Sequence, residues 1–380
     1  MKIAFLCTSA APGRDGVGDY TRRLAHACAD QGHECRLLAL NDRQAVHSST
    51  EMFAGQGMMT TWPATQPWSV RSGSICAALE QFAPDWISWQ MVSYGYHAKG
   101  ILGPEIIDLA QKLRGWRSHV MLHEIWIGVA RGDSWWSRYI GWRQRRALLA
   151  FLHAAAPVHL ETSNESYAAV LAQHGRGASV APLFSNIPIV AATPEAQAAA
   201  VDRHLPTPAR RGGRLVCVTF GSLHRQWRPQ AAARLLQMLA DRHNRDPMLL
   251  AIGRIGPHGP RVIRELNRAG LTTATTGELA PEAVSCLLQA AHAGVSAHPC
   301  ALVGKSGSVA AMLDHGLPVL VPRDDWQLRR GALPNGRSDP RLARLTDLVN
   351  GNGDAWLHRR HSPGDSFPGK VARFLSGLSA

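Results

Sequence analysis

Apolar runs the length of a strand alternate along the chain with stretches of helical periodicity. Residues 2–9 (KIAFLCTS) form the first apolar run, which leads into an Ala-Ala-Pro-Gly turn and predicts a buried parallel strand. Apolar positions at 20, 24, 27 and 28 then have helical spacing, Gly32 follows as a stop, and a second apolar run begins. Strand, glycine loop, helix and strand in this order begin a doubly wound sheet.

The same alternation continues through two successive halves of the chain. Residues 85–92 (DWISWQMV) and 119–126 (HVMLHEIW) predict strands, and residues 103–113 between them predict a helix. A second series of strands and helices starts at residue 214. The stretch between the halves, residues 186–213, is rich in Pro, Ala and Arg and is interpreted as the interdomain connection.

These patterns predict an α/β protein with two Rossmann-like, doubly wound domains facing each other across a cleft. The length of 380 residues also favours two domains, because a single core seldom grows that large. The predicted limits are residues 1–188 and 189–365, followed by a short terminal helix over residues 366–380.

Composition describes a soluble or peripherally bound globular protein. Hydrophobic residues make up 45% of the chain and charged residues 18%, and the longest apolar stretch is too short to cross a bilayer. Seven cysteines without a CxxC pair favour reduced thiols in a cytoplasm over a disulfide framework or a structural zinc site. The net charge of +13 suits phosphorylated substrates, anionic lipid or nucleic acid, although arginine usage in a GC-rich genome explains part of it.

The first glycine loop spans residues 11–20 (APGRDGVGDY). Its glycines do not have the GxGxxG spacing of dinucleotide-binding loops. Gly16 and Gly18 still let the backbone approach a ligand and leave N–H groups free for an anion at the helix start. The alternative is a plain tight turn between strand and helix.

The second loop, GKSGS over residues 304–308, predicts a phosphate cradle. Lys305 supplies a positive charge, and the amides and hydroxyls of Ser306, Gly307 and Ser308 can surround phosphate oxygens at a helix N-terminus. The loop is not a Walker A motif, because Pro299 stands where that motif needs glycine. The alternative for Lys305 is a solvated surface lysine.

Two further positions lie where predicted strands end. Arg225 follows the first strand of the second half, at the edge of an open sheet where ligands bind, and could hold a diphosphate. His123 and Glu124 end another strand, where His123 could shuttle a proton. The alternatives are a surface arginine and a structural histidine. HExxH zinc binding is excluded because Ile127 occupies the second histidine position.

Residues 135–152 (WWSRYIGWRQRRALLAFL) mix five aromatic residues with four arginines ahead of and within an apolar helix. Such a segment suits an anionic membrane surface or a lipid-linked acceptor. The alternative, which we favour, is aromatic packing on the sheet with the arginines outside. Nucleic-acid binding is not expected, since no known module accompanies the charge.

The two halves and their loops resemble the GT-B glycosyltransferases, most closely glycosyltransferase family 4. The loop DGVGDYTRRLA looks like the family's Gly-Gly-Val-Gly opening, and SGSVAAMLDHGLPVLV looks like its glutamate helix and following strand. VAPLFSNIPI and TGELAPEAVSCLLQAAHAGVSAHP are similar to the segments that precede the crossing and frame the nucleoside. His123 falls at the family's cleft histidine, and the terminal GKVARFL at its last helix, which in many members crosses back to the N-terminal domain.

The resemblance implies a hexosyltransferase that moves a sugar from a UDP- or GDP-linked donor to a glycan, lipid-linked or small-molecule acceptor, with no metal and no other cofactor. The first domain would take the acceptor, near residues 15–18, Tyr94, Tyr96 and His123. The second domain would hold the donor through a set of residues in its loops: Arg225, Gly277, Glu278, His298, Lys305, Ser306, Gly307 and Ser308. The candidate general bases are Asp15, His123 and Glu124. We expect a cytoplasmic protein, with the inner face of the membrane as a further location.

Two departures from the family affect the mechanism. Val303 and Ala311 stand where members carry two glutamates, and Ser222 and Trp227 where they carry Arg and Lys. Two alternatives to a transferase follow: a catalytically silent GT-B subunit that binds a nucleotide sugar, and a sugar-nucleotide epimerase on the same fold.

Overall fold

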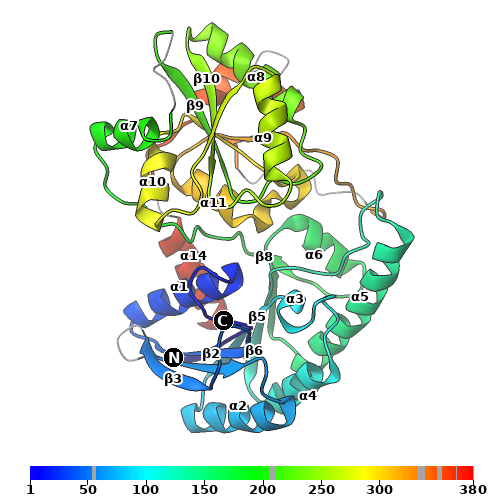
Figure 1. Cartoon of the computed structure of the whole chain (residues 1–380). Helices are drawn as coiled ribbons and strands as arrows, with labels where there is room; N and C mark the ends of the chain where they lie inside the picture. The colour runs from blue at the N-terminus through cyan, green and yellow to red at the C-terminus, as the bar shows by residue number, and fades with distance from the viewer. Residues whose placement is uncertain (54–56, 206–210, 332–338, 349–352, 365, 380) are drawn as a thin grey trace. The chain divides into compact units, whose positions relative to one another are not determined.

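The computed structural model describes residues 1–53, 57–205, 211–331, 339–348, 353–364 and 366–379. The described chain divides into two compact units (Figure 1). Unit 1 holds residues 1–182 together with the later segments 328–331 and 367–379. Unit 2 holds residues 183–327 and the described residues between 339 and 366. The expected domain limits at residues 188 and 365 stay a prediction, and residue 365 lies outside the described residues.

The sheet of unit 1 has the strand order β3-β4-β2-β1-β5-β6-β7-β8. All neighbours pair in parallel except β3 and β4, which are antiparallel. Its strands are β1 Lys2–Cys7, β2 Glu34–Asp42, β3 Ser49–Phe53, β4 Gly57–Pro63, β5 Trp86–Met91, β6 Arg117–Leu122, β7 His159–Thr162 and β8 Ser179–Val180. Its helices are α1 Gly16–Asp30, α2 Trp68–Phe82, α3 Ser93–Tyr96, α4 Pro104–Lys112, η1 Leu113–Gly115, α5 Trp135–Ala155, α6 Glu165–Ala172 and α14 Phe367–Ser379.

The sheet of unit 2 is parallel throughout, in the order β11-β10-β9-β12-β13-β14. Its strands are β9 Arg214–Phe220, β10 Asp246–Ile252, β11 Thr272–Thr275, β12 Ala293–Val295, β13 Val319–Val321 and β14 Leu342–Arg344. Its helices are α7 Pro194–Asp202, α8 Pro229–Arg242, α9 Gly259–Arg268, α10 Pro281–Ala290, η2 Cys300–Lys305, α11 Gly307–Asp314, α12 Leu345–Asp347 and α13 Gly353–Leu357.

The predicted fold class is confirmed, since each unit is a mostly parallel sheet wound with helices. The central strands read as apolar runs because both faces of the sheet are covered. In unit 1, Trp89 of β5 packs edge-to-face on Phe151 of α5 with ring centroids 5.2 Å apart. The ring centroids of Phe5 on β1 and Phe374 on α14 lie 5.8 Å apart. Helix α14 therefore packs on the sheet of unit 1.

Three local predictions need correction. The strand predicted over residues 119–126 is β6, which ends at Leu122, so His123 and Glu124 begin the following loop. The predicted interdomain connection contains a helix, α7, capped by Thr193, and its residues 206–210 lie outside the described residues. The antiparallel β3–β4 pair was not predicted, because β3 is short and mostly exposed and has no apolar run.

Candidate functional site

Three loops of unit 1 meet at the carboxyl edge of its sheet, after β1, β2 and β5. The backbone N–H of Asn41 donates to the Thr8 carbonyl at 2.9 Å, and its side-chain amide donates to the Gly95 carbonyl at 2.8 Å. A β-carbon on Gly95 would lie 2.6 Å from the Thr8 hydroxyl oxygen, so only glycine allows this approach. These contacts bring the segments of Asp15, Tyr94 and Tyr96 to one edge of unit 1, as the open-sheet rule predicts.

Asp15 serves as the N-cap of α1. One carboxylate oxygen accepts from the backbone N–H groups of Val17 and Gly18, at 2.9 and 3.4 Å. The other accepts from the Thr8 hydroxyl at 3.0 Å. A carboxylate has about four lone-pair positions, so the three accepted hydrogen bonds leave Asp15 little freedom to turn toward a substrate. The catalytic role of Asp15 therefore stays a prediction, and its structural role is clear.

The two glycines of the first loop face different surroundings. A β-carbon on Gly18 would collide with the carbonyl oxygen of Ser9, so this glycine lets α1 pack against the end of β1. A β-carbon on Gly16 would meet no atom within 4 Å. Gly18 thus has a packing role in the fold, and ligand contact by either glycine stays a prediction.

His123 lies at the end of a chain of buried hydrogen bonds. Its Nε2 lies 2.9 Å from the Gln90 side-chain oxygen, and the Gln90 amide nitrogen donates to the Ser88 hydroxyl at 2.9 Å. That hydroxyl lies 2.9 Å from His119 Nδ1, and His119 Nε2 lies 3.2 Å from the Glu161 carboxylate. One proton arrangement satisfies the contacts of both histidines: His123 and His119 each donate from Nε2, to the Gln90 oxygen and to the Glu161 carboxylate.

The surroundings keep His123 neutral. Burial, and after it the neighbouring His119, lower the pKa of His123 to about 3. With the proton held on Nε2 by Gln90, its Nδ1 is the hydrogen-bond acceptor. The Tyr20 ring packs edge-on against the imidazole, with centroids 4.9 Å apart. This geometry suits a fixed acceptor of hydrogen bonds better than a proton shuttle at neutral pH.

Glu124 and Tyr94 complete the expected acceptor side. Glu124 is half-buried in the loop that begins at His123. The Tyr94 hydroxyl accepts from the Gln144 side-chain amide at 3.0 Å, which connects the loop after β5 to α5. The structure therefore groups His123, Glu124 and Tyr94 around neighbouring strand ends of unit 1.

In unit 2 the predicted phosphate loop forms the start of α11. The Ser306 hydroxyl accepts from the Val309 N–H at 3.3 Å and lies 2.9 Å from the Ser308 hydroxyl. Ser306 is therefore the N-cap, a role that leaves the first amides of the helix directed outward. Gly307 is exposed, and a β-carbon there would meet nothing within 4 Å.

Positive charge gathers around His298, which follows β12 at the same sheet edge. The Nδ1 atom of His298 is buried and has no hydrogen-bond partner among the described residues. Burial, and after it the charges of Lys305, Arg323 and His224, lower the pKa of His298 to about 4. These groups surround His298 closely enough to act on its charge, and together they favour an anion.

Arg323 is a member of this cluster that the sequence reasoning missed. It follows β13 directly, and its guanidinium donates to Asp325, to the Ala297 carbonyl at 3.3 Å and to the Gln226 side chain at 2.8 Å. The rule that ligands bind at the carboxyl ends of parallel strands could have found it. Trp227, at the family's lysine position, is buried and donates to the Ser296 carbonyl at 2.9 Å, so it belongs to the core.

The other predicted donor contacts of unit 2 are exposed. Arg225 is exposed, and its carbonyl accepts from Arg261 at 2.7 Å. The carbonyl of Gly277 accepts from Gly253 at 3.0 Å in an isolated bridge between the loops after β10 and β11. Glu278 forms an exposed ion pair with Arg254 at 2.5 Å. Their contact with a donor stays a prediction.

The positions of the missing glutamates are apolar in space as well as in sequence. Ala311 is fully buried, and Val303 packs against the same core cluster. The acid of α11, Asp314, accepts from the Ser366 hydroxyl at 2.7 Å and from the Ser185 N–H at 3.2 Å, so it holds chain segments together. The described part of α11 and its loop therefore presents positive charge and hydroxyls, and no exposed carboxylate.

Two properties of the described residues concern metals and membranes. They contain no group of three or more His, Cys, Asp or Glu side chains placed to hold a metal ion. Within the same parts of the chain, no helix has the length and apolar character needed to span a bilayer.

Solved structures with a similar fold align with nearly the whole chain. The Anabaena protein Alr3699/HepE, in complex with UDP and glucose, aligns at a TM-score of 0.56 and 15% identity over 100% of this chain and 99% of that one. WaaG, a glycosyltransferase involved in lipopolysaccharide biosynthesis, aligns at a TM-score of 0.54 and 13% identity, over 99% of this chain and 100% of that one. The UDP-GlcNAc 2-epimerase from Methanocaldococcus jannaschii aligns at a TM-score of 0.55 and 12% identity, over 99% of each chain.

No family model matches the chain, and no curated protein matches it either. At these identities the structural matches concern the fold, which transferases and epimerases share. The chain has the GT-B fold, as predicted.

Proposed function

We propose that the protein is a GT-B glycosyltransferase that uses a nucleotide-diphosphate sugar, UDP- or GDP-linked, as donor. One observation carries the proposal: the cations Lys305 and Arg323 lie around the neutral His298 beside the start of α11, at the carboxyl edge of the unit 2 sheet. That edge is where open α/β sheets bind nucleotides. The UDP bound to the Anabaena protein, which has the same fold, supports this choice of ligand.

In the proposed reaction the bond between the sugar's anomeric carbon and the donor diphosphate breaks, and the diphosphate leaves with the electron pair. Lys305, Arg323 and the amides at the start of α11 would stabilise its growing charge. An acceptor hydroxyl forms the new bond to the anomeric carbon. Its proton passes to a base, for which Asp15, His123 and Glu124 are the candidates, or to the departing diphosphate when configuration is retained.

The acceptor is proposed to bind unit 1. The fixed Nδ1 acceptor of His123 and the tyrosines after β5 support this assignment, because they can orient a hydroxyl. Contact with the inner face of a membrane is a further proposal for this unit. It is supported by Trp135, Trp136 and Tyr139 of α5, whose side chains are exposed, contrary to the aromatic packing we favoured from the sequence.

A thermal-shift series with UDP, GDP, ADP and their sugars tests donor binding. We expect one nucleotide to raise the melting temperature, because it binds the folded state alone. Lys305→Ala should weaken that binding by about tenfold, the effect of losing one charge-assisted contact, while Lys99→Ala in unit 1 leaves it unchanged. A chain that binds none of these nucleotides would contradict the proposal.

Product analysis then separates the alternatives. A transferase releases nucleoside diphosphate and labels an acceptor when given a radiolabelled donor. Donor binding without any turnover would instead indicate a catalytically silent subunit. Interconversion of the donor sugar in the absence of acceptor would indicate an epimerase, the activity named for the Methanocaldococcus jannaschii protein.

A further inference from the structure

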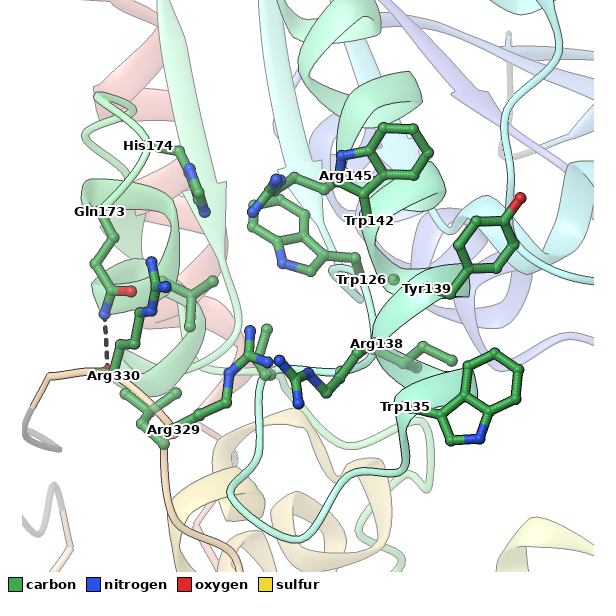
Figure 2. A pocket seen from close by; sticks show the side chains of 16 residues that line it. Trp126, Trp135, Arg138, Tyr139, Trp142, Arg145, Gln173, His174, Arg329 and Arg330 are labelled. Atoms are coloured by element: carbon green, nitrogen blue, oxygen red, sulfur yellow. Dashed lines mark hydrogen bonds between the residues drawn. The ribbon is translucent and has the colours of Figure 1, made fainter.

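Unit 1 contains an open pocket of about 510 Å³ that lies between α5, the end of α6 and the returning segment 328–330 (Figure 2). All of its lining residues belong to unit 1. The side chains that matter are four arginines and four aromatic residues: Arg138, Arg145, Arg329 and Arg330 with Trp126, Trp135, Tyr139 and Trp142. We call it the arginine pocket.

Close backbone contacts build one wall of the arginine pocket. A β-carbon on Gly141 of α5 would collide with the Ile127 carbonyl, and one on Gly128 would lie 2.7 Å from the Arg138 α-carbon. The loop after β6 can therefore lie directly on α5. The buried Gln144 fixes it there, since its side-chain oxygen accepts from the Ile127 N–H at 2.9 Å.

The returning segment is held by its backbone. Leu328 forms an isolated antiparallel bridge with Ala130, and the Arg329 N–H donates to the Val129 carbonyl at 2.8 Å. The Gln173 amide donates to the Arg330 carbonyl at 3.1 Å, the contact dashed in Figure 2. Both arginine side chains therefore start from a fixed backbone.

Four guanidinium groups share this pocket. None of them forms an ion pair with an acid in the described chain. Figure 2 shows Arg138 and Arg329 pointing toward one another. Burial lowers the pKa of Arg329, and so do the charges of Arg138 and Arg330, while Asp133 opposes them. Like charges placed together repel, and a bound anion relieves that repulsion.

The aromatic side chains give the pocket an apolar face. Trp135, Tyr139 and Trp142 are 74, 45 and 43% exposed, values unusual for side chains of this size in a monomeric surface. The rings of Tyr139 and Trp142 stack with centroids 6.1 Å apart and extend the face along α5. Flat π surfaces suit the C–H faces of sugar rings, and guanidinium forks suit phosphate or carboxylate.

We infer that the arginine pocket binds an acidic saccharide, one whose ring packs on Trp142 and Tyr139 while its phosphate or carboxylate pairs with Arg138 and Arg329. That this saccharide is the acceptor of the sugar transfer rests on the proposed function. The binding site itself does not, because it lies within unit 1 and uses none of the donor groups.

Calorimetry with three oligosaccharides of equal length tests the inference: maltotetraose, maltotetraose phosphorylated at its reducing end, and tetragalacturonate. We expect at least one of the acidic oligosaccharides to bind, and neutral maltotetraose to bind at least about tenfold more weakly. Arg329→Ala should weaken acidic binding about tenfold, and Trp142→Ala by a similar factor. The matched control is Arg143→Ala, which changes an exposed arginine of the same helix that does not line the pocket.

Several outcomes would overturn the inference. These are equal binding of the neutral and acidic oligosaccharides, no binding of either acidic one, or equal loss in Arg143→Ala and Arg329→Ala. Phosphatidylglycerol vesicles form a separate arm, with phosphatidylcholine vesicles as reference. Arg329-dependent binding to the anionic vesicles, without saccharide binding, would assign the pocket to a lipid surface instead.

The nucleotide thermal shift, measured on the same variants, separates this test from that of the proposed function. In Arg329→Ala, the nucleotide should raise the melting temperature by as much as it does in the unaltered chain. Saccharide binding in a protein that binds no nucleotide would refute the proposed transferase and leave the pocket assignment standing. The reverse result would refute the pocket alone.

Discussion

At the scale of single residues, two neutral histidines mark the candidate sites, and each is set by different neighbours. His123 is held neutral by burial within a hydrogen-bonded chain, whereas His298 is held neutral by burial beside cations. The sequence indicated both positions, since each follows a strand of a parallel sheet. It did not indicate the partners Gln90 and Glu161, which belong to other strands and come together only through sheet pairing.

Glu161 gives the first prediction. Burial alone would raise its pKa, but the hydrogen bond from His119 and the charge of Arg373 hold the pKa of Glu161 below its ordinary 4.5. A carboxylate with a lowered pKa in the folded state stabilises the fold above its unfolded pKa, and that contribution is lost as the pH falls through the folded pKa. Glu161→Gln should therefore lower the free energy of unfolding by about 1 kcal/mol at pH 7 and by less at pH 3.

Urea unfolding at the two pH values measures this difference. Glu51→Gln is the matched control, because Glu51 is exposed on β3 and should show no such dependence. A Glu161→Gln effect that stays constant between pH 7 and pH 3 would rule out the carboxylate as its source.

Gly307 gives a second prediction at this scale. Its β-carbon position is open in the folded chain, so Gly307→Ala should leave the free energy of unfolding unchanged or raise it slightly, because alanine favours helix. The added methyl group would stand where a diphosphate approaches the first turn of α11. Titration of the nucleotide identified by thermal shift should show binding weakened by about tenfold, or 1.4 kcal/mol.

If Gly307→Ala instead binds the nucleotide as tightly as the unaltered chain, the backbone of this turn does not hold the diphosphate. Gly16→Ala serves as the control, since Gly16 also faces open space at a helix start, in unit 1. This pair therefore tests which of the two predicted glycine loops binds phosphate.

At the scale of elements, α5 departs most from the sequence-based expectation. Aromatic residues normally favour burial, and its pattern of Trp and Tyr suggested packing on the sheet. The helix instead buries Ile140, Leu148 and Phe151 and exposes the aromatic residues of its first two turns. Helical periodicity could not separate the two faces here, because both carry large apolar side chains.

Two glycines inside helices make a matched prediction. Gly141 of α5 touches the Ile127 carbonyl, so Gly141→Ala should lower the free energy of unfolding by about 2 kcal/mol through overpacking. Gly73 of α2 faces open space, so Gly73→Ala should raise it by about 0.5–1 kcal/mol, the helix propensity gain. Thermal or urea unfolding of both variants checks the opposite signs. A stabilising Gly141→Ala would mean that the loop after β6 does not lie on α5.

At the scale of the whole molecule, the sequence predicted the two-sheet architecture well because parallel strands leave uninterrupted apolar runs. The arrangement of charges was far less predictable. Arg323 and Arg329 lie close together in the sequence, yet one belongs to unit 2 and the other to unit 1. Apart from Asp325, their partners Ala297, Gln226 and Val129 lie in loops far away in the chain, so spacing alone could not assign either arginine to a site.

The terminal helix gives the last prediction, because it belongs to unit 1 although it follows unit 2 in the chain. Phe374 packs on Phe5 of β1 and lies edge-on to His119 of β6 at 5.2 Å. Phe374→Ala should therefore lower the free energy of unfolding by about 3 kcal/mol, and it should destabilise the sheet of unit 1. Hydrogen–deuterium exchange should rise in peptides from β1, β5 and β6 more than in peptides from β9 and β10.

Trp356 provides the control for that experiment. It is buried in the core of unit 2, so Trp356→Ala should increase exchange in β9 and β10 first. If Phe374→Ala raised exchange equally in both sheets, the two units would unfold as one cooperative body. A rise confined to the second sheet would contradict the placement of α14 on the first. The selective pattern would show that the proposed acceptor unit depends on α14, whose Phe374 packs on β1 and β6.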